Sequence, residues 1–197
     1  MISKAPILDP GIAVILASGS PRRRELLRGM GIVFEVCVSD ADETPPAGAT
    51  PAEAVAVIAR RKAEAVLGEV AADTLVIAAD TTVDLDGVSL GKPRSEDEAL
   101  SMLLSLSGRT HHVHTGVAVA YRGRLLTATD TTAVTFRAYP REAAEDYVRT
   151  GEPMDKAGAY GIQGLGGALV AGIRGEFDNV VGLPCALLAR LIAEVTK

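Results

Sequence analysis

Two short apolar runs constrain the fold of this chain more than any other feature of its sequence. Residues 12–17 (IAVILA) follow a glycine, and residues 74–79 (TLVIAA) end at Asp80. Apolar runs of this length that are bounded by turn or polar residues are typical of buried strands. We therefore predict two buried strands, with Asp80 at the carboxyl end of the second.

The segments around these runs predict helices and further strands. Ser20 and Pro21 supply an N-cap and a first-turn proline for a helix that ends near Arg28. Further helices are expected over residues 52–67, 95–106 and 140–149 and from about residue 184, and the second of these begins with a capping-box pattern. Further strands are expected over residues 32–38, 111–121, 125–138 and 168–173, with a hairpin turn at 122–123.

The order of these elements predicts the fold class. Strands and helices alternate at first and strands gather in the second half, which indicates an α/β protein with a mixed sheet, in two lobes on either side of about residue 80. Only 4% of the 197 residues are aromatic, so alanine, valine, leucine and isoleucine must form the core. We expect an N-terminal tail over residues 1–11 and one domain over residues 12–197.

Charge and composition exclude several classes of partner. A net charge of −5 disfavours a nucleic-acid polymer, which needs a basic surface. The longest uncharged stretch, residues 157–173, contains six glycines and would form a poor bilayer helix. Asp9 and Pro10 interrupt the apolar segment near the N-terminus, which argues against a secretory signal. Cys37 and Cys185 lie far apart without a CxxC motif, which suits a reducing environment. We therefore expect no membrane partner and a cytoplasmic location.

A basic segment, SGSPRRR at residues 18–24, joins the first predicted strand to the first helix. Backbone N–H groups at a helix N-terminus, together with the Ser18 hydroxyl and the Arg22 and Arg23 guanidinium groups, can bind phosphate oxygens. A solvated basic first turn is the alternative. Cations at a helix N-terminus oppose the helix dipole, however, and call for an anion to balance them.

Carboxylates occur in two places that suit cation binding or the orientation of a water molecule. Asp80 could hold Mg²⁺ or orient a water molecule, and the alternative is an aspartate that caps a turn. Asp40, Asp42 and Glu43 lie in a turn-rich segment, where one of them could supply a second oxygen ligand to a hard cation. A solvated acidic loop is the alternative for this group.

Lysines are scarce, and three of the five lie in short distinctive segments. Lys62, Lys92 and Lys156 each carry a compact charge that suits phosphate neutralisation. Gln163 lies between two glycines that would let the backbone approach a ligand, and its amide could read a nucleobase edge. A tight structural loop is the alternative for that segment.

The sequence HHVH at residues 111–114 suggests a metal site only superficially. On a strand, His112 and His114 share one face and His111 takes the other, so the three imidazoles cannot converge. We therefore expect no metal site there.

These segments, taken in order, resemble the Maf family of nucleoside triphosphate pyrophosphatases. Several ordered motifs carry the resemblance from about residue 12 to residue 185. The matching segments are LASGSPRRRELL (16–27), DADET (40–44), ARRKAEA (59–65), AADTTV (78–83), GKP (91–93), SGRTHHVHTGV (107–117), GEPMDKAGAYGIQGLGG (151–167) and NVVGLP (179–184).

The resemblance implies an elongated α/β fold like that of the inosine triphosphatases, with a deep cleft between two lobes. It also implies hydrolysis of nucleoside triphosphates to monophosphate and pyrophosphate with Mg²⁺ or Mn²⁺. By motif, Asp80 matches the family's proton acceptor, and Arg22, Thr81 and Gln163 match the positions that separate substrate subclasses. This set resembles the dTTP/UTP branch, whereas the 7-methyl-GTP branch tends to carry Trp, Gln and Glu. The other matched cleft residues are Ser18, Arg23, Glu43, Lys62 and Lys92.

We therefore expect an enzyme that acts on a small nucleoside triphosphate. In this hypothesis Asp80 activates water and helps to hold the cation, with Glu43 as a second ligand, while Thr81 and Gln163 help to select the pyrimidine. Ser18, Arg22, Arg23, Lys62 and Lys92 would bind phosphate oxygens. Two alternatives stay open, a nucleotide-binding regulator of septum formation without turnover and a purine-directed pyrophosphatase. The oligomeric state also stays open, and a homodimer is compatible with the sequence.

Overall fold

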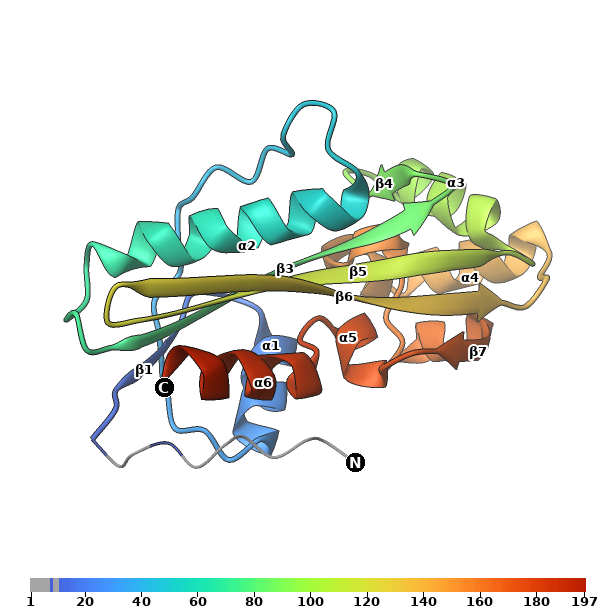
Figure 1. Ribbon diagram of the computed structural model, residues 1–197. Coiled ribbons are helices and arrows are strands. Elements are labelled where there is room, and N and C mark those ends of the chain that lie inside the picture. The colour runs from blue at the N-terminus through green and yellow to red at the C-terminus, as the bar shows by residue number, and fades with distance from the viewer. Residues whose placement is uncertain (1–7, 9–10) are drawn as a thin grey trace.

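The computed structural model describes residue 8 and residues 11–197, so most of the tail expected over residues 1–11 lies outside the described part. An elongated mixed sheet runs through the molecule, with helices on both faces (Figure 1). Its strands are β1 (Val14–Leu16), β2 (Glu35–Val36), β3 (Leu75–Leu85), β4 (Val88–Leu90), β5 (Thr110–Tyr121), β6 (Arg124–Phe136) and β7 (Val170–Arg174). The α/β class with a mixed sheet is confirmed.

The strand order is β2-β1-β3-β5-β6-β7, with β4 paired to β3. β1 is parallel to both β2 and β3, whereas all other pairs are antiparallel. The helices are α1 (Pro21–Gly29), α2 (Pro51–Leu67), α3 (Glu96–Leu106), α4 (Arg141–Arg149), α5 (Phe177–Val181) and α6 (Cys185–Val195). Three short 3₁₀ turns, η1 (Glu152–Asp155), η2 (Ala157–Ala159) and η3 (Leu165–Leu169), follow α4. In the described residues, none of the helices has the length and apolar character needed to cross a bilayer.

The two faces of the sheet are packed differently. α2 lies along one face, where small side chains such as Ala59, Ala63 and Ala118 allow a close approach. At Gly116 of β5 this approach leaves no room for a side chain, because an added Cβ would overlap the Val55 carbonyl of α2. α1 and α6 pack on the opposite face, and α3 and α4 extend the core toward the far end of the sheet (Figure 1). The long helix α2 is thus fixed firmly against β3 and β5.

Local sequence signals explain where the helices begin. The Ser20 side chain caps α1 ahead of Pro21, and Ser95 caps α3, as the sequence predicts. Thr50 and Glu53 form a full capping box at the start of α2, since each side chain accepts a hydrogen bond from the other residue's backbone. These caps fix the positions at which α1, α2 and α3 begin.

The prediction that Asp80 ends its strand is wrong. β3 continues for five residues beyond it, to Leu85, and Asp80 lies opposite Gly116 of β5. After Asp80, residues 81–84 pair with β5 and residues 83–85 pair with β4, so a polar residue does not end the strand. The strand expected over residues 32–38 is also shorter, because only Glu35 and Val36 pair with β1. Neither β4 nor α5 is among the elements expected from the sequence.

A gap in strand pairing singles out the middle of β3. On the edge of β3 that faces away from β5, β1 pairs with β3 residues up to Ile77, and β4 pairs with β3 residues from Val83 onward. In the described part of the sheet, residues 78–82 therefore border a gap between the end of β1 and β4. Asp80 and Thr81 lie at this gap, which is where the chain passes from β1 into α1.

Candidate active site

A cavity of about 840 Å³ occupies this gap and receives residues from several distant segments. α1 contributes its N-terminal turn, α2 the residues that face β3, and the segment after η2 a glycine-rich loop. The cavity brings together all nine residues that the sequence analysis proposed for the site: Ser18, Arg22, Arg23, Glu43, Lys62, Asp80, Thr81, Lys92 and Gln163.

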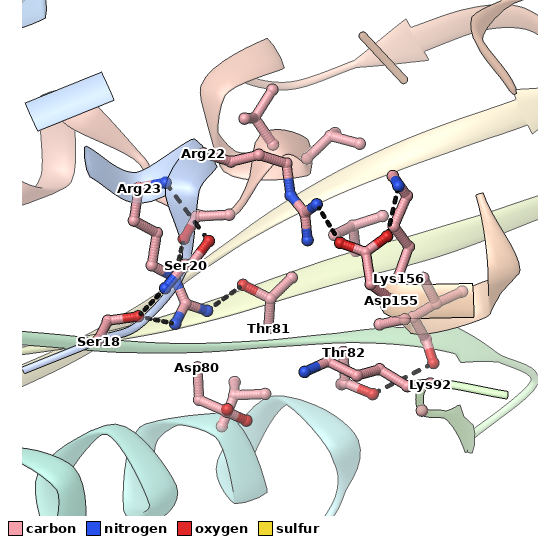
Figure 2. A pocket seen from close by; sticks show the side chains of 18 of the residues that line it. Ser18, Ser20, Arg22, Arg23, Asp80, Thr81, Thr82, Lys92, Asp155 and Lys156 are labelled. Carbon is pink, nitrogen blue, oxygen red and sulfur yellow. Dashed lines mark hydrogen bonds and ion pairs between the residues drawn. The ribbon is translucent and has the colours of Figure 1, made fainter. Parts of the chain in front are cut away.

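Asp80 and Thr81 point to opposite faces of β3 (Figure 2). The Asp80 carboxylate faces α2, whereas the Thr81 hydroxyl faces α1 and α5. Successive strand residues alternate in this way, and the missing neighbour at the gap leaves both side chains beside one cavity. The cavity is therefore lined from both faces of the sheet.

On the α2 face, one ammonium joins two carboxylates. The Lys62 Nζ lies 2.8 Å from the Asp80 Oδ1 and 3.0 Å from the Glu43 Oε2. The Lys62 and Asp80 side chains are only 10% and 17% exposed, whereas that of Glu43 is 61% exposed. Arg61, the residue before Lys62, donates to the Asp42 and Thr44 carbonyls and so holds the acidic loop against α2. These contacts bring Glu43 to Asp80.

On the other face, Arg23 is buried and all three of its nitrogens donate hydrogen bonds. Its Nε donates to the Gly182 carbonyl at 2.9 Å, and its two Nη atoms donate to the hydroxyls of Ser18 and Thr81 at 3.1 Å each. Among the described residues, no carboxylate forms an ion pair with it. Burial lowers the pKa of Arg23, although the more distant Asp80 charge opposes this. A buried guanidinium without an anion favours an anionic ligand beside it.

The Thr81 hydroxyl belongs to a buried hydrogen-bond chain. It accepts from Arg23 and lies 3.0 Å from the Thr115 hydroxyl, which donates to the Asn179 carbonyl. Thr115 has only one hydroxyl proton, so Thr81 must be the donor between the two threonines. The Asn179 amide then donates to the Thr132 hydroxyl and to the Val113 carbonyl. Both the proton and a lone pair of the Thr81 hydroxyl are thus used within the protein.

Arg22 points across the mouth of the cavity to the segment after α4. Its Nη1 lies 2.9 Å from the Asp155 Oδ2, and the Lys156 Nζ lies 2.6 Å from the other oxygen (Figure 2). Burial raises the pKa of Asp155, but hydrogen bonds from Lys156 and Arg22 outweigh it and lower this pKa to about 2. Asp155 therefore stays ionised and joins α1 to the glycine-rich segment.

Gln163 and Lys92 are both exposed members of the predicted set. Gln163 is exposed in a loop between η2 and η3, and Lys92 is exposed after β4 with its ammonium toward the cavity (Figure 2). Among the described residues, no carboxylate lies within ion-pair distance of Lys92. Both side chains are therefore available to a ligand.

The histidines behave as their alternation on the strand predicts. The rings of His112 and His114 stack 6.1 Å apart on one face of β5, whereas His111 is buried on the other, where its Nε2 lies 2.9 Å from the Tyr160 hydroxyl. His114 contacts Asp84 and Thr131. Within residues 11–197, no group of three or more His, Cys, Asp or Glu side chains is placed to hold a metal ion by itself.

Several residues of the site escaped sequence reasoning. Asp155, Thr115 and Asn179 organise Arg22 and Thr81, and Glu152 contacts the loop that carries Gln163. The acidic residues of GEPMDKAG were a visible signal, because they flank the motif lysine Lys156. For Thr115 and Asn179 the sequence offers no comparable signal, since their role depends on pairing across the sheet.

The arrangement can neutralise a polyanion at several points. Arg22, Arg23, Lys62, Lys92 and Lys156 line the cavity, against the carboxylates of Glu43, Asp80, Glu152 and Asp155. Cations from α1, α2 and the segment after β4 share the cavity with Asp80, a carboxylate that can accept a proton. Such a site suits attack of water on a phosphate group, which requires positioning and charge neutralisation.

Comparisons with known proteins point in the same direction. The model of the family described as "Maf-like protein" matches residues 13–195. A dTTP/UTP pyrophosphatase of Pelotomaculum thermopropionicum is 49% identical over 91% of this chain and 94% of its own. Proteins of the same name from Bacillus cereus (strain G9842) and Methylobacillus flagellatus are each 48% identical, over 90% and 91% of this chain and 92% and 90% of their own.

The fold is shared more widely than the sequence. The structure of the Staphylococcus aureus Ham1 protein superposes with a TM-score of 0.53 at 14% identity, covering 92% of this chain and 98% of that protein. At this identity the similarity concerns the fold alone.

Proposed function

The chain belongs to the Maf-like protein family, and from this premise we propose that it hydrolyses dTTP and UTP to the nucleoside monophosphate and pyrophosphate. Relatives that are 48–49% identical over nine-tenths of the chain carry the name dTTP/UTP pyrophosphatase. The observation that carries the proposal is the buried Arg23 guanidinium, which has no carboxylate partner among the described residues and lines the same cavity as Asp80.

Phosphate binding falls to the cations of the cavity. Arg23 has two N–H groups beyond the three that Ser18, Thr81 and Gly182 accept, and a phosphate oxygen would complete its hydrogen bonding. Lys92 adds a mobile ammonium from the other side of the cavity. Arg22 would exchange its Asp155 partner for a phosphate oxygen or share it.

Asp80 is the proposed general base. Its carboxylate would accept a proton from the water that attacks the α-phosphorus, so that the bond to the β-phosphate breaks and pyrophosphate leaves. Lys62 holds one carboxylate oxygen at 2.8 Å and leaves the second free of that contact. Lys62 would therefore orient Asp80 and also offset the charge of the phosphates.

The residues present fit a divalent cation at Asp80 and Glu43. Oxygens of both carboxylates lie within 3.0 Å of the single Lys62 ammonium, so the two side chains already converge where a positive charge is stabilised. Carboxylate oxygens suit Mg²⁺ or Mn²⁺, which commonly use one or two carboxylates together with substrate phosphates. When bound, the cation would neutralise charge on the phosphates.

Selection of the pyrimidine is assigned to Gln163, with Arg22 and Thr81 in supporting roles. The Gln163 amide offers a donor and an acceptor to a base edge. Because the Thr81 hydroxyl is engaged by Arg23 and Thr115, Thr81 would act through the position of Arg23 instead of through a hydrogen bond to the base.

We further propose that one domain, residues 12–197, carries the activity, and that the two free thiols fit a reducing cytoplasm.

One panel tests this proposal. The purified protein is incubated with eight ribo- and deoxyribonucleoside triphosphates and Mg²⁺ or Mn²⁺, and pyrophosphate is measured. Release from dTTP and UTP above the purine nucleotides is the expected result. Purine-only release would favour the purine-directed alternative, and binding without release would favour a regulator.

A further inference from the structure

We propose that Glu152 is a positioning residue for base selection, because its carboxylate fixes the loop of residues 161–166 and thereby holds Gln163 at the cavity. This inference rests on the proposed function and extends it to a residue that acts through the loop it binds. It concerns which nucleobase is accepted and leaves the chemistry at Asp80 unchanged.

Three hydrogen bonds tie Glu152 to the loop and to α4. Its Oε2 accepts from the Leu165 amide at 3.0 Å, and its Oε1 accepts from the Gly166 amide at 3.1 Å and from the Tyr147 hydroxyl at 2.8 Å. The two amides follow Gln163 by two and three residues. The Tyr147 hydroxyl in turn accepts from the Gly161 amide at 3.0 Å, so the loop is held before and after Gln163.

Two glycines of the loop pass close to the Glu152 carboxylate. A Cβ added to Gly164 would lie 2.5 Å from the Glu152 Oε2, and one added to Gly161 would lie 3.2 Å from the Oε1 and 2.7 Å from the Lys156 Cε. A side chain at either position would therefore require the Glu152 or Lys156 side chain to shift. The carboxylate supplies the fixed contact that such a glycine-rich loop lacks by itself.

The charge of Glu152 matters as much as its shape. Burial raises the pKa of Glu152, but backbone hydrogen bonds from Leu165 and Gly166 outweigh it, so the pKa is lowered overall. An ionised carboxylate accepts at both oxygens, whereas an amide would turn a donor toward one of these N–H groups. A change to glutamine keeps the size of the side chain but removes a hydrogen bond between this side chain and the loop.

The same segment also holds Arg22. The Lys156 Nζ donates to the Glu152 carbonyl at 2.6 Å and to Asp155, which pairs with Arg22. Glu152 thus lies between two of the positions assigned to substrate selection. Its carboxylate binds the loop that carries Gln163, and its backbone carbonyl is linked to Arg22 through Lys156 and Asp155.

A double-mutant cycle tests the proposal with Glu152→Gln, Gln163→Ala and the two changes combined. Equilibrium binding of the α,β-imido analogues of UTP and GTP is measured for each protein, together with kcat and KM for UTP. Glu152→Gln should weaken UTP-analogue binding about tenfold and reduce the preference over the GTP analogue, while kcat changes little. In the Gln163→Ala background, Glu152→Gln should cause no further loss of preference. Glu145→Gln, at a carboxylate on α4 that pairs with Arg141, is the matched control.

Unchanged preference in Glu152→Gln, or additive effects of the two changes, would overturn the proposal. If Glu152→Gln does not fold by circular dichroism, Tyr147→Phe replaces it in the cycle, since it removes one donor to the carboxylate and the acceptor of the Gly161 amide and should shift the preference in the same direction. Because the analogues resist cleavage, binding preference remains measurable even if the wild-type protein hydrolyses no nucleotide. Absence of hydrolysis would reject the proposed function, whereas the role of Glu152 would still be tested by the binding preference.

Discussion

The Lys62 ammonium on α2 lies 2.8 Å from the Asp80 Oδ1 on β3, and both side chains are largely shielded from water. The pair is possible because α2 packs closely on the sheet, as the absence of space beside Gly116 demonstrates. A shielded ion pair of this kind fixes the orientation of the carboxylate, and loss of either partner leaves the other charge poorly compensated. The packing of α2 thus determines the geometry of the proposed base.

The first prediction concerns Asp80. Asp80→Asn keeps the shape of the side chain and removes its ability to accept a proton, so we expect kcat to fall by about a thousandfold or more. Pyrophosphate release from UTP measures this, and circular dichroism verifies the fold. Asp84→Asn, on the same strand and face but paired with His114, is the control and should retain most activity. Near-normal turnover in Asp80→Asn would reject the assignment.

The second prediction concerns the geometry of Arg23. Arg23→Lys retains the charge but cannot make three hydrogen bonds in the directions of Ser18, Thr81 and Gly182. We expect kcat/KM for UTP to fall by roughly a hundredfold and the melting temperature to fall by a few degrees. Arg24→Lys, at the neighbouring residue that donates to the Gly19 carbonyl, is the control. Equal activity of the two variants would mean that charge alone is required at position 23.

Much of this arrangement could be predicted from the sequence because its signals are local. The caps at Ser20 and Ser95, the hairpin between β5 and β6 and the opposite faces of His111 and His112 depend only on neighbouring residues. The nine residues of the candidate site were recognised through motif order, and the cavity contains them all. Their individual roles remain proposals.

What could not be predicted depends on pairing between distant segments. The extension of β3 beyond Asp80 follows from its register with β5, and the gap beside Asp80 follows from the positions at which β1 and β4 stop pairing. Neither is encoded in the residues next to Asp80. Asn179 likewise becomes part of the site only because the sheet brings Thr115 to it.

The third prediction concerns the base. Gln163→Glu replaces the amide with a carboxylate, which cannot donate a hydrogen bond to the pyrimidine edge. We expect KM for dTTP and UTP to rise about tenfold or more, with a smaller change for the purine nucleotides. Steady-state kinetics over the nucleotide panel measures this, with Leu165→Ala as a control at an exposed neighbour in the same loop. An unchanged order of preference would refute the role of Gln163.

The fourth prediction concerns the divalent cation. Chelation with EDTA should abolish pyrophosphate release, and Mg²⁺ or Mn²⁺ should restore it. Glu43→Gln removes one of the two carboxylates that converge on Lys62, so the cation concentration for half-maximal activity should rise about tenfold. Asp42→Asn, at an exposed carboxylate on the same loop, should leave it unchanged. Full activity in EDTA would contradict the cation requirement.

The fifth prediction concerns stability at acid pH. His111 is buried among Phe136 and Tyr160, and burial, aided by the nearby His112, lowers its pKa to about 4. The neutral ring is therefore favoured in the folded state, whereas in the unfolded chain it titrates near its ordinary pKa of 6.5. The stabilisation is fully present above pH 6.5 and is lost as the pH falls toward 4, because only the unfolded chain gains the proton.

This shift corresponds to about 3 kcal/mol of unfolding free energy between pH 6.5 and pH 4. Urea unfolding followed by circular dichroism over this range measures it. His111→Asn cannot titrate there, so its unfolding free energy should depend less on pH by about that amount. His112→Asn, at the exposed neighbour on the opposite face, should retain most of the wild-type dependence. The same slope in His111→Asn and wild type would show that the acid sensitivity arises at other groups.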